Sequence, residues 1–205
     1  IDDKNRTITS DKIKYNKITN VVEAEGKVKV EDVVNNYVIK SEKINYFKET
    51  NKIVTNGFTE ANVENKYHIE SQNVAYFLDT NEISSEVKSK IKDNKNQIYF
   101  LDKFIFNVDT SLLKGVNVLT ITNHNLPKSD KFFFLDGIFN LENNTFIASE
   151  TKINIHKNIF DNEKNDPRIY GASSKGESNL TTINKGVFTT CQKRDGCPPW
   201  KIKSN

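Results

Sequence analysis

Hydrophobic and polar residues alternate along most of this chain, and one pattern of alternation returns about every thirty residues. The pattern is a β-branched aliphatic residue, a spacer, Ser, two polar residues, Ile or Val, a spacer and Tyr. It occurs at residues 8–15, 39–46 and 69–76, with its serines at Ser10, Ser41 and Ser71. Repeats of this length with a strand-like period are typical of stacked or rolled β-architectures, whose single units cannot bury their apolar face alone.

The repeat predicts a strand that bends at its serine. Ile39 and Ile44 are an odd number of positions apart, so a flat strand would point them to opposite faces. One extra residue at the Ser41 corner returns both to one face, as a β-bulge or a sharp bend does. The apolar residues are therefore expected on the inside of the bend, and Gly26 and Gly57 each follow a repeat serine by sixteen residues.

The pattern predicts successive strands separated by Asn-rich turns. We expect strands at residues 21–31, 36–46, 52–64, 66–77, 97–108, 116–122 and 145–155, the last looking like a degenerate repeat, and an extended or loop conformation for 79–96. Phe132, Phe133, Phe134 and Leu135 are apolar on both faces, which predicts a strand covered on both sides. The packed β-domain is expected to span residues 1–175, followed by a linker at 176–205.

Composition and charge narrow the class of function. The 205 residues carry 30 basic and 27 acidic side chains, a net charge of +3, and the two signs are interleaved as on a solvated strand face. Nucleic-acid binders concentrate their basic residues in a stripe, so we expect no nucleic-acid partner. No run approaches the length of a membrane-spanning helix, and the first residues lack the pattern of a signal peptide. The chain contains no Met, and we expect a processed or excised segment.

Enzymatic signatures are absent from the sequence. There is no Gly-rich phosphate loop and no GxSxG elbow. The histidines, His68, His124 and His156, are scattered through strands and turns. We therefore expect no catalytic residue, no cofactor and no metal.

The cysteines are Cys191 and Cys197. Their spacing, without a second pair or nearby histidines, argues against zinc. In an oxidising compartment they could pair with each other, contributing roughly 2 kcal/mol. They could equally pair outside this chain, or be two unrelated thiols.

A family resemblance rests on three features together: the serine repeat, residues 166–191 and the closing residues 197–203, which read CPPWKIK. The chain resembles the N-terminal periplasmic domain of LptD, the outer-membrane lipopolysaccharide-assembly family, and the repeat alone also resembles LptA and LptC. The resemblance covers nearly the whole chain. It implies an all-β fold, a V-shaped, half-open β-jelly-roll of bent antiparallel strands (OstA-like).

The resemblance also implies disulfides and a place in the cell. Cys191 and Cys197 match the family's cysteines near the junction with a C-terminal barrel, where they pair with cysteines of that barrel. The best-known members carry a further cysteine near the mature N-terminus, which this sequence lacks, and no barrel follows Asn205, so we expect an excised domain. The expected location is the periplasmic side of the outer membrane.

The implied function is lipopolysaccharide transport and outer-membrane assembly. At ~0.8 kcal/mol per CH₂ group, exposing one twelve-carbon acyl chain to water costs on the order of 10 kcal/mol, so the chains need an apolar groove while they cross an aqueous space. The groove candidates are the apolar repeat positions and two later aromatics: Ile39, Ile44, Tyr46, Ile69, Val74, Tyr76, Phe104 and Phe106. The alternative reading is that these are ordinary core residues of a closed sandwich.

The resemblance implies protein partners as well. An unpaired edge strand is a site for strand addition. The N-terminal edge, with Ile8, Ile13 and Tyr15, is expected to receive an LptA-like periplasmic bridge protein that delivers lipopolysaccharide. Further expected partners are the chain's own C-terminal barrel and an LptE-like lipoprotein.

Three other functions remain open from the sequence. A repeat-built β-solenoid adhesin or structural surface protein would have a closed, dry interior and stacked side-chain ladders. A carbohydrate-active β-helix enzyme would need clustered carboxylates on an exposed sheet. The third is a stand-alone bridge protein like LptA or LptC.

Overall fold

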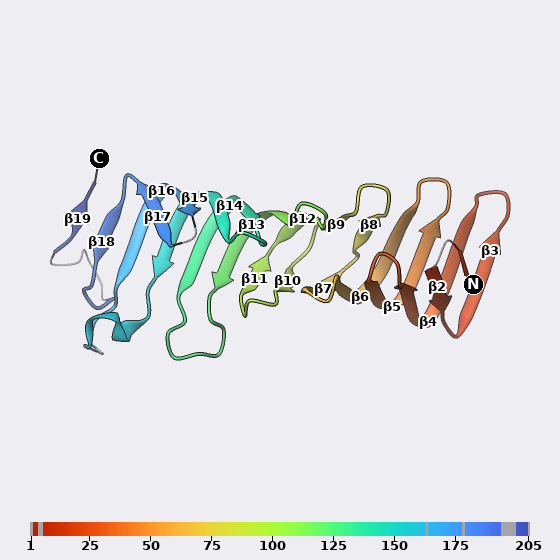
Figure 1. Cartoon of the computed structure of the whole chain (residues 1–205), viewed down its shortest axis with the longest axis horizontal. Helices are drawn as coiled ribbons and strands as arrows, with labels where there is room; N and C mark the ends of the chain where they lie inside the picture. Colours follow the sequence, from red (N-terminus) through yellow and green to blue (C-terminus); the bar gives the residue numbers. More distant parts are fainter. Residues whose placement is uncertain (1, 4–5, 163, 178, 194–199, 205) are drawn as a thin grey trace.

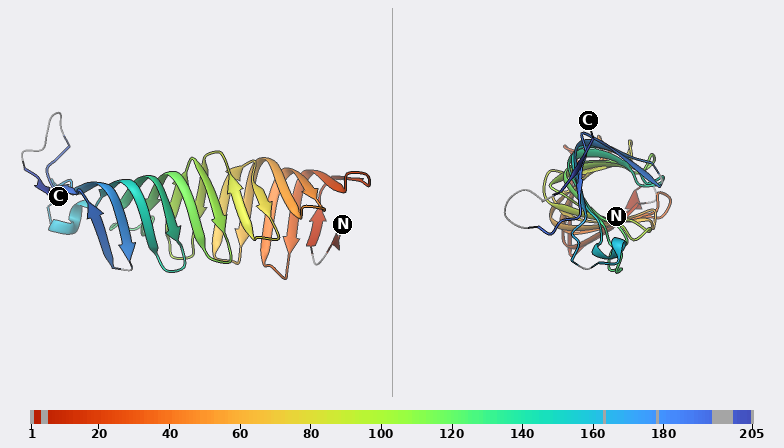
Figure 2. Two further views of the ribbon diagram at one scale, coloured as in Figure 1. Left: turned by 90° about the horizontal axis from the view of Figure 1, so that it is seen from above. Right: turned by 90° about the vertical axis from the view of Figure 1, so that its left-hand side faces the viewer.

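The chain folds into one long rolled β-sheet in a computed structural model, which describes residues 2–3, 6–162, 164–177, 179–193 and 200–204. The strands follow one another along the long axis in chain order, and the two termini lie at opposite ends (Figure 1). Seen along that axis, the strands wrap around a central line (Figure 2). The all-β prediction is confirmed, and the fold is a β-jelly-roll of bent antiparallel strands.

The described residues form nineteen strands and one short 3₁₀ helix. Their bounds are β1 (Asp2–Asp3), β2 (Arg6–Thr9), β3 (Lys12–Asn16), β4 (Val21–Asp32), β5 (Tyr37–Phe47), β6 (Lys52–Val63), β7 (Tyr67–Gln72), β8 (Ala75–Phe77), β9 (Glu82–Ser85), β10 (Ser89–Lys92), β11 (Ile98–Leu101), β12 (Lys103–Asn107), β13 (Leu112–Ile121), β14 (Lys131–Asn140), β15 (Thr145–Asn154), η1 (Lys157–Phe160), β16 (Arg168–Glu177), β17 (Leu180–Asn184), β18 (Val187–Thr189) and β19 (Ile202–Lys203).

The strands bend midway, as the repeat predicts. The register between β4 and β5 shifts between Glu25 and Val28, and that between β5 and β6 shifts between Ser41 and Lys43. Each bend divides a strand, or a pair of short strands, into two halves that belong to two facing walls. The extra residue at the bend of β5 makes the side chains of the second half point inward again. Ile39 and Ile44 are therefore both buried, and the prediction of bent strands is confirmed.

The backbone conformation at the first two bends favours glycine. Gly26 and Gly57 have φ values of 78° and 91°, in the left-handed region that side chains with a Cβ rarely adopt. At Gly26 an added Cβ would also lie 3.0 Å from the Cβ of Asp11. The spacing of sixteen residues after Ser10 and Ser41 therefore places glycine where the strand turns from one wall to the other.

Hydroxyl groups fill the inside of the bends. Ser71 is buried, and its Oγ lies 2.9 Å from Ser85 Oγ and 2.7 Å from Ser89 Oγ. Near the preceding bend Ser41 Oγ donates to the carbonyl oxygen of Phe58 over 3.2 Å. Buried hydroxyls are stable only when they are hydrogen-bonded, and Ser41 and Ser71 each find partners inside the bend, Ser41 in a carbonyl oxygen and Ser71 in two other serines.

Turns at the strand ends form two rims. The first rim consists of the turns 17–20, 48–51, 78–81, 108–111 and 141–144, and the second rim of the turns 33–36, 64–66, 93–97, 122–130 and 155–167. Backbone hydrogen bonds of 2.9 to 3.1 Å run along the first rim, from Lys48 to Asn20, Leu78 to Asn51, Val108 to Asn81 and Leu141 to Ser111. The line along which the two rims approach each other is called the seam here.

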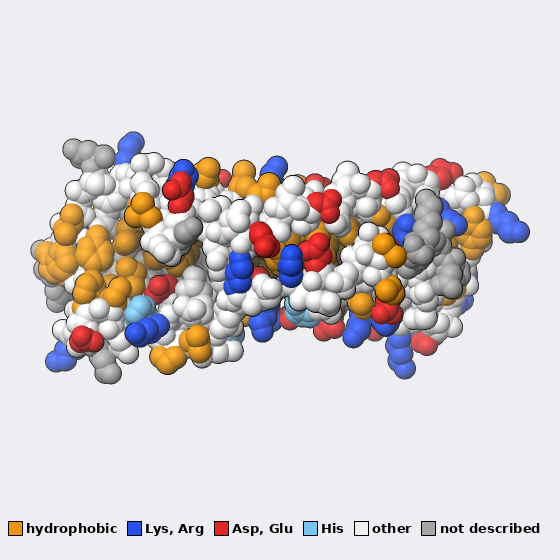
Figure 3. All heavy atoms as spheres, viewed as in Figure 1, with side chains coloured by type: hydrophobic (Ala, Val, Ile, Leu, Met, Phe, Trp, Pro, Cys, Tyr) orange, Lys and Arg blue, Asp and Glu red, His pale blue; other side chains and the backbone are white. Residues whose placement is uncertain are grey.

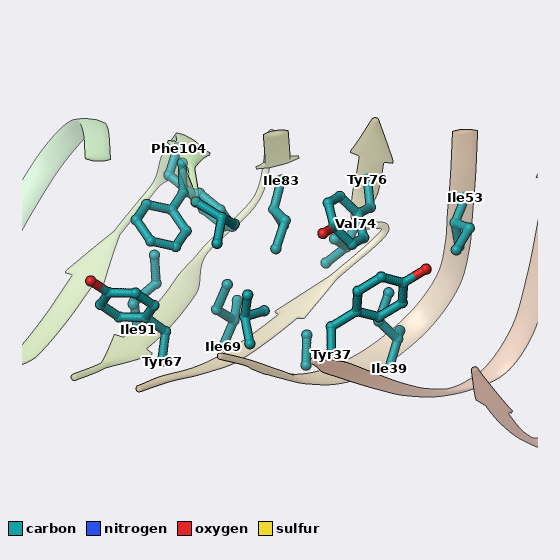
Figure 4. Close-up of a cluster of buried hydrophobic side chains, with 14 of the residues drawn as sticks. Tyr37, Ile39, Ile53, Tyr67, Ile69, Val74, Tyr76, Ile83, Ile91 and Phe104 are labelled. Atoms are coloured by element: carbon teal, nitrogen blue, oxygen red, sulfur yellow. The ribbon is translucent and has the colours of Figure 1, made fainter. Parts of the chain in front are cut away.

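A continuous apolar core lies between the two walls. It extends from Ile8 on β2 to Ala148 on β15. Figure 4 shows its central part, where Tyr37, Ile39, Tyr67 and Ile69 on one side face Ile53, Tyr76, Ile83 and Phe104 on the other. Burial of these side chains at strand period is the main source of stability for such a sheet.

Two sequence expectations need correction or qualification. Residues 132–135 are not covered on both sides: Leu135 is 50% exposed on the outer face, because no further layer packs against that wall. The expected domain boundary at residue 175 lies inside β16, and β17, β18 and β19 continue the sheet beyond it. Ser174 and Gly176 of β16 are buried and face inward, and β16 pairs with both β17 and β18. The role of residues 176–205 as a linker stays a prediction.

Candidate functional site

The eight groove candidates from the sequence all lie in the core, from 0% exposed at Phe106 to 3% at Tyr46. The structure brings them together in one cluster, and neighbouring aromatic rings pack edge to face, with centroids 5.0 Å apart for Tyr37 and Tyr76 and 4.9 Å for Tyr67 and Phe106. A cavity beside Arg6 and Ile8 measures only about 10 Å³. In this conformation the interior around the repeats is therefore filled by the chain's own side chains.

The C-terminal half of the interior contains a larger cavity of about 200 Å³. Its walls come from β11, β13, β14, β15, β16 and β17. The aromatic part of the lining consists of Tyr99, Phe132, Phe134, Phe139 and Phe146. Pockets that bind apolar ligands are mostly lined in this way, with a small number of polar groups at the margin.

The phenylalanine rings form a connected wall. Phe134 lies 5.1 Å from Phe146 and 5.4 Å from Phe139, and Phe132 lies 6.3 Å from Phe146, measured between ring centroids. Gly176 stands directly opposite Phe146 in the sheet register. A Cβ at Gly176 would overlap the Phe146 ring, so glycine leaves this ring its present position beside the cavity.

Polar side chains occupy the mouth of the cavity. Gln97 Nε2 donates to Asn144 Oδ1 over 3.2 Å, and Tyr99 Oη donates to Gln97 Oε1 over 3.1 Å. Asn144, Glu177 and the 65% exposed Leu180 also line the cavity, which is therefore open to water on this side. Burial raises the pKa of the Tyr99 hydroxyl, which stays protonated and able to donate.

Polar contacts join the two rims across the seam at several places. Near the N-terminus Arg6, whose partner in the register is Asp32, donates to Asn51 Oδ1 over 2.9 Å and to Tyr46 Oη over 3.0 Å. In the middle, Tyr67 Oη donates to Ser111 Oγ over 2.9 Å.

Further along the seam the contacts come from the second-rim turn 93–97. Lys95 Nζ donates to the carbonyl oxygen of Leu141 over 3.0 Å and also to that of Glu142. The carboxylate of Glu142 in turn lies 3.7 Å from Lys66 Nζ. Among the described residues no hydrogen bond or ion pair joins the next two turns, 122–130 and the short connection after β16, and the cavity lies there.

The predicted partner edge falls on two strands. β3, which carries Ile13 and Tyr15, pairs with β4 alone among the described residues, and Tyr15 is 45% exposed. Ile8 lies on β2, which pairs with both β1 and β4, and its side chain is buried in the core. The open edge is therefore at β3, whereas Ile8 faces the interior.

The C-terminal segment is held by an arginine. Arg168 Nη1 donates to the carbonyl oxygens of Asp166, over 2.9 Å, and of Cys191. Cys191 Sγ lies 3.9 Å from the carbonyl oxygen of Trp200. Cys197 lies outside the described residues, so the pairing expected for the two cysteines stays a prediction.

The histidines have ordinary polar neighbours. His68 Nδ1 lies 2.8 Å from Asn62 Oδ1, and His156 Nδ1 lies 2.8 Å from Asp130 Oδ1. The described residues contain no group of three or more His, Cys, Asp or Glu side chains that could hold a metal ion. They also form no helix that is both long enough and apolar enough to cross a membrane.

The sequence prediction missed the cavity. The signal that could have located it is the density of aromatic residues between Phe132 and Phe146, where Phe occurs five times. Strand alternation places Phe132 and Phe134 on one face, but which aromatic rings enclose a space depends on small residues such as Gly176 on a strand thirty or more positions away.

The fold and the site define a rolled β-sheet with an apolar interior that is filled in its N-terminal part and hollow in its C-terminal part. No family model and no curated protein matches the chain. Among solved structures the chain is similar to LptH, described as the LptA homologous periplasmic component of the conserved lipopolysaccharide transport device from Pseudomonas aeruginosa. The identity is 13%, the TM-score is 0.44, and the match covers 50% of this chain and 75% of that chain. A likeness of this size does not establish a function.

Proposed function

We propose that this chain is a periplasmic carrier segment that shelters acyl chains of lipopolysaccharide during transport to the outer membrane. The observation that carries the proposal is the cavity of about 200 Å³ between the two walls, lined by phenylalanine and open to water through a polar mouth. An amphipathic lipid fits such a site, since its acyl chain lies against the rings while its sugar head stays outside.

Burial of the acyl chain stabilises the proposed complex. Each CH₂ group that leaves water gains ~0.8 kcal/mol, so even partial insertion of a chain stabilises the complex by several kcal/mol. Tyr99, Phe134 and Phe139 are already buried, so the site needs little ordering before it binds. The groove candidates from the sequence, such as Tyr46 and Phe104, extend this site toward the N-terminus when the walls separate.

The open edge at β3 suggests a place for this chain in the transport system. We propose that it is the N-terminal domain of an LptD-like protein, receiving lipopolysaccharide through its β3 edge from an LptA-like bridge protein. An open edge strand accepts a further strand by backbone hydrogen bonds, which supports this orientation. The lipid would then leave toward a C-terminal barrel with its LptE-like lipoprotein. The alternative, a stand-alone bridge protein like LptA or LptC, would use the same two features of this chain.

Site-specific photocrosslinking tests the proposal. A photoreactive phenylalanine analogue at Phe132, which lines the cavity, is expected to form an adduct with purified lipopolysaccharide. The matched control is the same analogue at Ile147, which is 64% exposed on the outer face. Equal adducts at both positions, or none at Phe132, would reject the carrier function.

A structural role is the second candidate, and one observation favours it. Tyr46 Oη donates to Asn51 Oδ1 over 3.1 Å, and Asn51 Nδ2 donates to Asp79 Oδ1 over 2.5 Å. The same arrangement recurs one repeat earlier, from Tyr15 through Asn20 to Glu49, and one repeat later, from Tyr76 through Asn81 to Asp109. Such a ladder along a filled core is typical of a rigid spacer, which would carry no lipid at all.

A further inference from the structure

The seam contacts nearest the cavity form a distinct group, which we call the clasp. It consists of Lys95 and Gln97 on the second rim and of Leu141, Glu142 and Asn144 on the first rim. Gln97 and Asn144 line the cavity, whereas Glu142 reaches back to Lys66 on the preceding turn of the second rim. The clasp therefore borders the cavity on the side of the filled core.

The clasp turn is built to hold its two donors in place. Asp93 is 4% exposed, and its Oδ1 accepts hydrogen bonds of 2.9 Å from the backbone N–H groups of Lys95 and Gln97. This bonding fixes the turn 93–97, and with it the directions of both side chains. On the opposite rim the backbone N–H of Leu141 donates to Ser111 over 2.9 Å, which anchors the turn that accepts from Lys95.

The cavity is small for the ligand that the proposed function assigns to it. An engineered apolar cavity of about 150 Å³ holds one benzene molecule, so about 200 Å³ accommodates on the order of eight carbon atoms. A longer acyl chain that is to stay out of water has to continue into the N-terminal core, where Phe104 and Phe106 are at most 2% exposed. Since close-packed walls do not deform continuously, the walls must part there, and the clasp is the seam contact nearest the cavity, ahead of the bond from Tyr67 to Ser111, that such parting first breaks.

We propose that the clasp is a gate that sets the length of acyl chain the interior accepts. This inference rests on the proposed carrier function and concerns the regulation of the same site. Closed, the clasp confines a chain to the cavity. When the clasp opens, the cavity becomes continuous with the groove of the repeats. A long acyl chain therefore binds the open state more tightly than the closed state. A ligand shifts a conformational equilibrium only through such a difference in affinity.

Locking the rims together tests the gate. The probes are octanoate and tetradecanoate, titrated by calorimetry below their critical micelle concentrations. The protein carries Gln97→Cys and Asn144→Cys in a Cys191→Ser, Cys197→Ser background, with the new thiols joined by a short bis-maleimide. The matched control is the same protein with both thiols capped by N-ethylmaleimide, which leaves the rims free to separate.

The gate predicts that the linked protein binds tetradecanoate about tenfold more weakly than the capped protein, whereas octanoate binds both equally. Equal binding of tetradecanoate to the two forms would overturn the gate and leave the carrier function standing. Failure of both acids to bind the capped protein would overturn the carrier function itself, and the gate with it.

A second variant opens the clasp without new cysteines. Lys95→Ala removes the bonds to the carbonyl oxygens of Leu141 and Glu142 and is expected to speed tetradecanoate binding roughly fivefold, with octanoate unaffected. Lys114→Ala, at an exposed lysine on the outer face of β13, is the control. A rate that changes equally for both acids, or equally in both variants, would contradict the gate.

Discussion

The ammonium group of Lys95 donates a hydrogen bond to the carbonyl oxygen of Leu141 over 3.0 Å, across forty-six positions of sequence and from one rim of the roll to the other. Antiparallel strands that follow one another along the chain can make only local contacts within the sheet. A contact across the seam, together with the apolar core, holds the two walls of the bent sheet together at this point. In Figure 3 the middle of the visible face carries lysine and acidic side chains close together, whereas apolar side chains gather at the C-terminal end.

Loss of this contact is expected to loosen the first rim locally. Lys95→Ala leaves the sheet ladder intact, and the turn 141–144 then opens more often because its carbonyl oxygens lose a charged donor. Amide hydrogen exchange in residues 141–145 should become roughly fivefold faster, about 1 kcal/mol of local opening free energy. Exchange in the turn 48–51 serves as the internal control. A uniform increase along the chain would mean global destabilisation and would contradict the local role.

Asp93 gives the turn 93–97 a pH dependence. Burial raises the pKa of its carboxyl group, and the backbone N–H groups of Gln97 and Lys95 oppose the shift only in part. The folded state therefore binds more protons than the unfolded state between the ordinary and the raised pKa, so the free energy of unfolding falls as the pH rises through that window.

Asp93→Asn keeps the accepting oxygen and removes the charge. The variant should therefore lose less stability than the parent as the pH rises above the ordinary pKa of an aspartate, about 4, in urea unfolding followed by circular dichroism. Asp79→Asn, at an exposed position, is the control. A stability difference between variant and parent that is the same at neutral and acid pH would show that titration of Asp93 does not contribute to the pH dependence.

The repeat serines are expected to carry stability rather than binding. Ser71→Ala removes the hydroxyl that Ser85 and Ser89 share, while both keep their bonds to the carbonyl oxygens of Gln72 and Val87, so the loss is expected to cost about 1 kcal/mol. The urea midpoint should fall with an unchanged m value. Ser10→Ala, at the corner of the first repeat, where the partly exposed serine donates to the carbonyl oxygen of the nearby Lys12, should change the midpoint by much less. Equal losses in the two variants would refute the special role of the buried cluster.

Gly176 is expected to protect the cavity. Gly176→Val places a side chain where the Phe146 ring now lies and moves that ring toward the open space. Binding of tetradecanoate should weaken about tenfold, while the fold is retained in circular dichroism. Gly186→Ala is the control, because a Cβ there meets no atom closer than 3.4 Å. Unchanged affinity in Gly176→Val would place the lipid elsewhere.

The β3 edge is expected to serve protein binding and not lipid binding. Ile13→Pro disturbs the backbone of β3 and removes one N–H group. Association with an LptA-like bridge protein should weaken roughly tenfold in a pull-down titration, with tetradecanoate affinity unchanged. The same substitution at Ile202, the exposed first residue of β19 at the opposite end, is the comparison. Equal loss of both activities in Ile13→Pro would count against a separate partner edge.

The repeat pattern predicts the bent strands well because each bend is a local property. Two local features determine where the strand turns: the odd number of positions between Ile39 and Ile44, and the glycine at position 57. Neither depends on the rest of the chain. The same parity places the groove candidates on the inner face. The boundaries of β4, β5 and β6 differ from expectation by at most a residue or so at each end, since Asn-rich turns limit them.

The clasp and the cavity could not be predicted in this way. Both depend on how far the sheet twists between strands, which decides that Lys95 faces the turn 141–144 and not its neighbours. Residues 172–177 are small or polar, yet Ser174 bonds to Thr151 over a distance of 2.6 Å and Gly176 accommodates Phe146. These residues form a strand because they pack beside β15, and the sequence pattern alone does not reveal this contact.

Nuclear Overhauser contacts between carbon-13-labelled tetradecanoate and the aromatic rings test the central claim most directly. The account predicts contacts from the acyl methylene groups to the rings of Phe132, Phe134 and Phe146 inside the roll. It predicts none to Phe100, which is exposed on the outer face of β11. Contacts confined to Phe100, or no contacts to any ring at saturating acid, would contradict an acyl-binding interior.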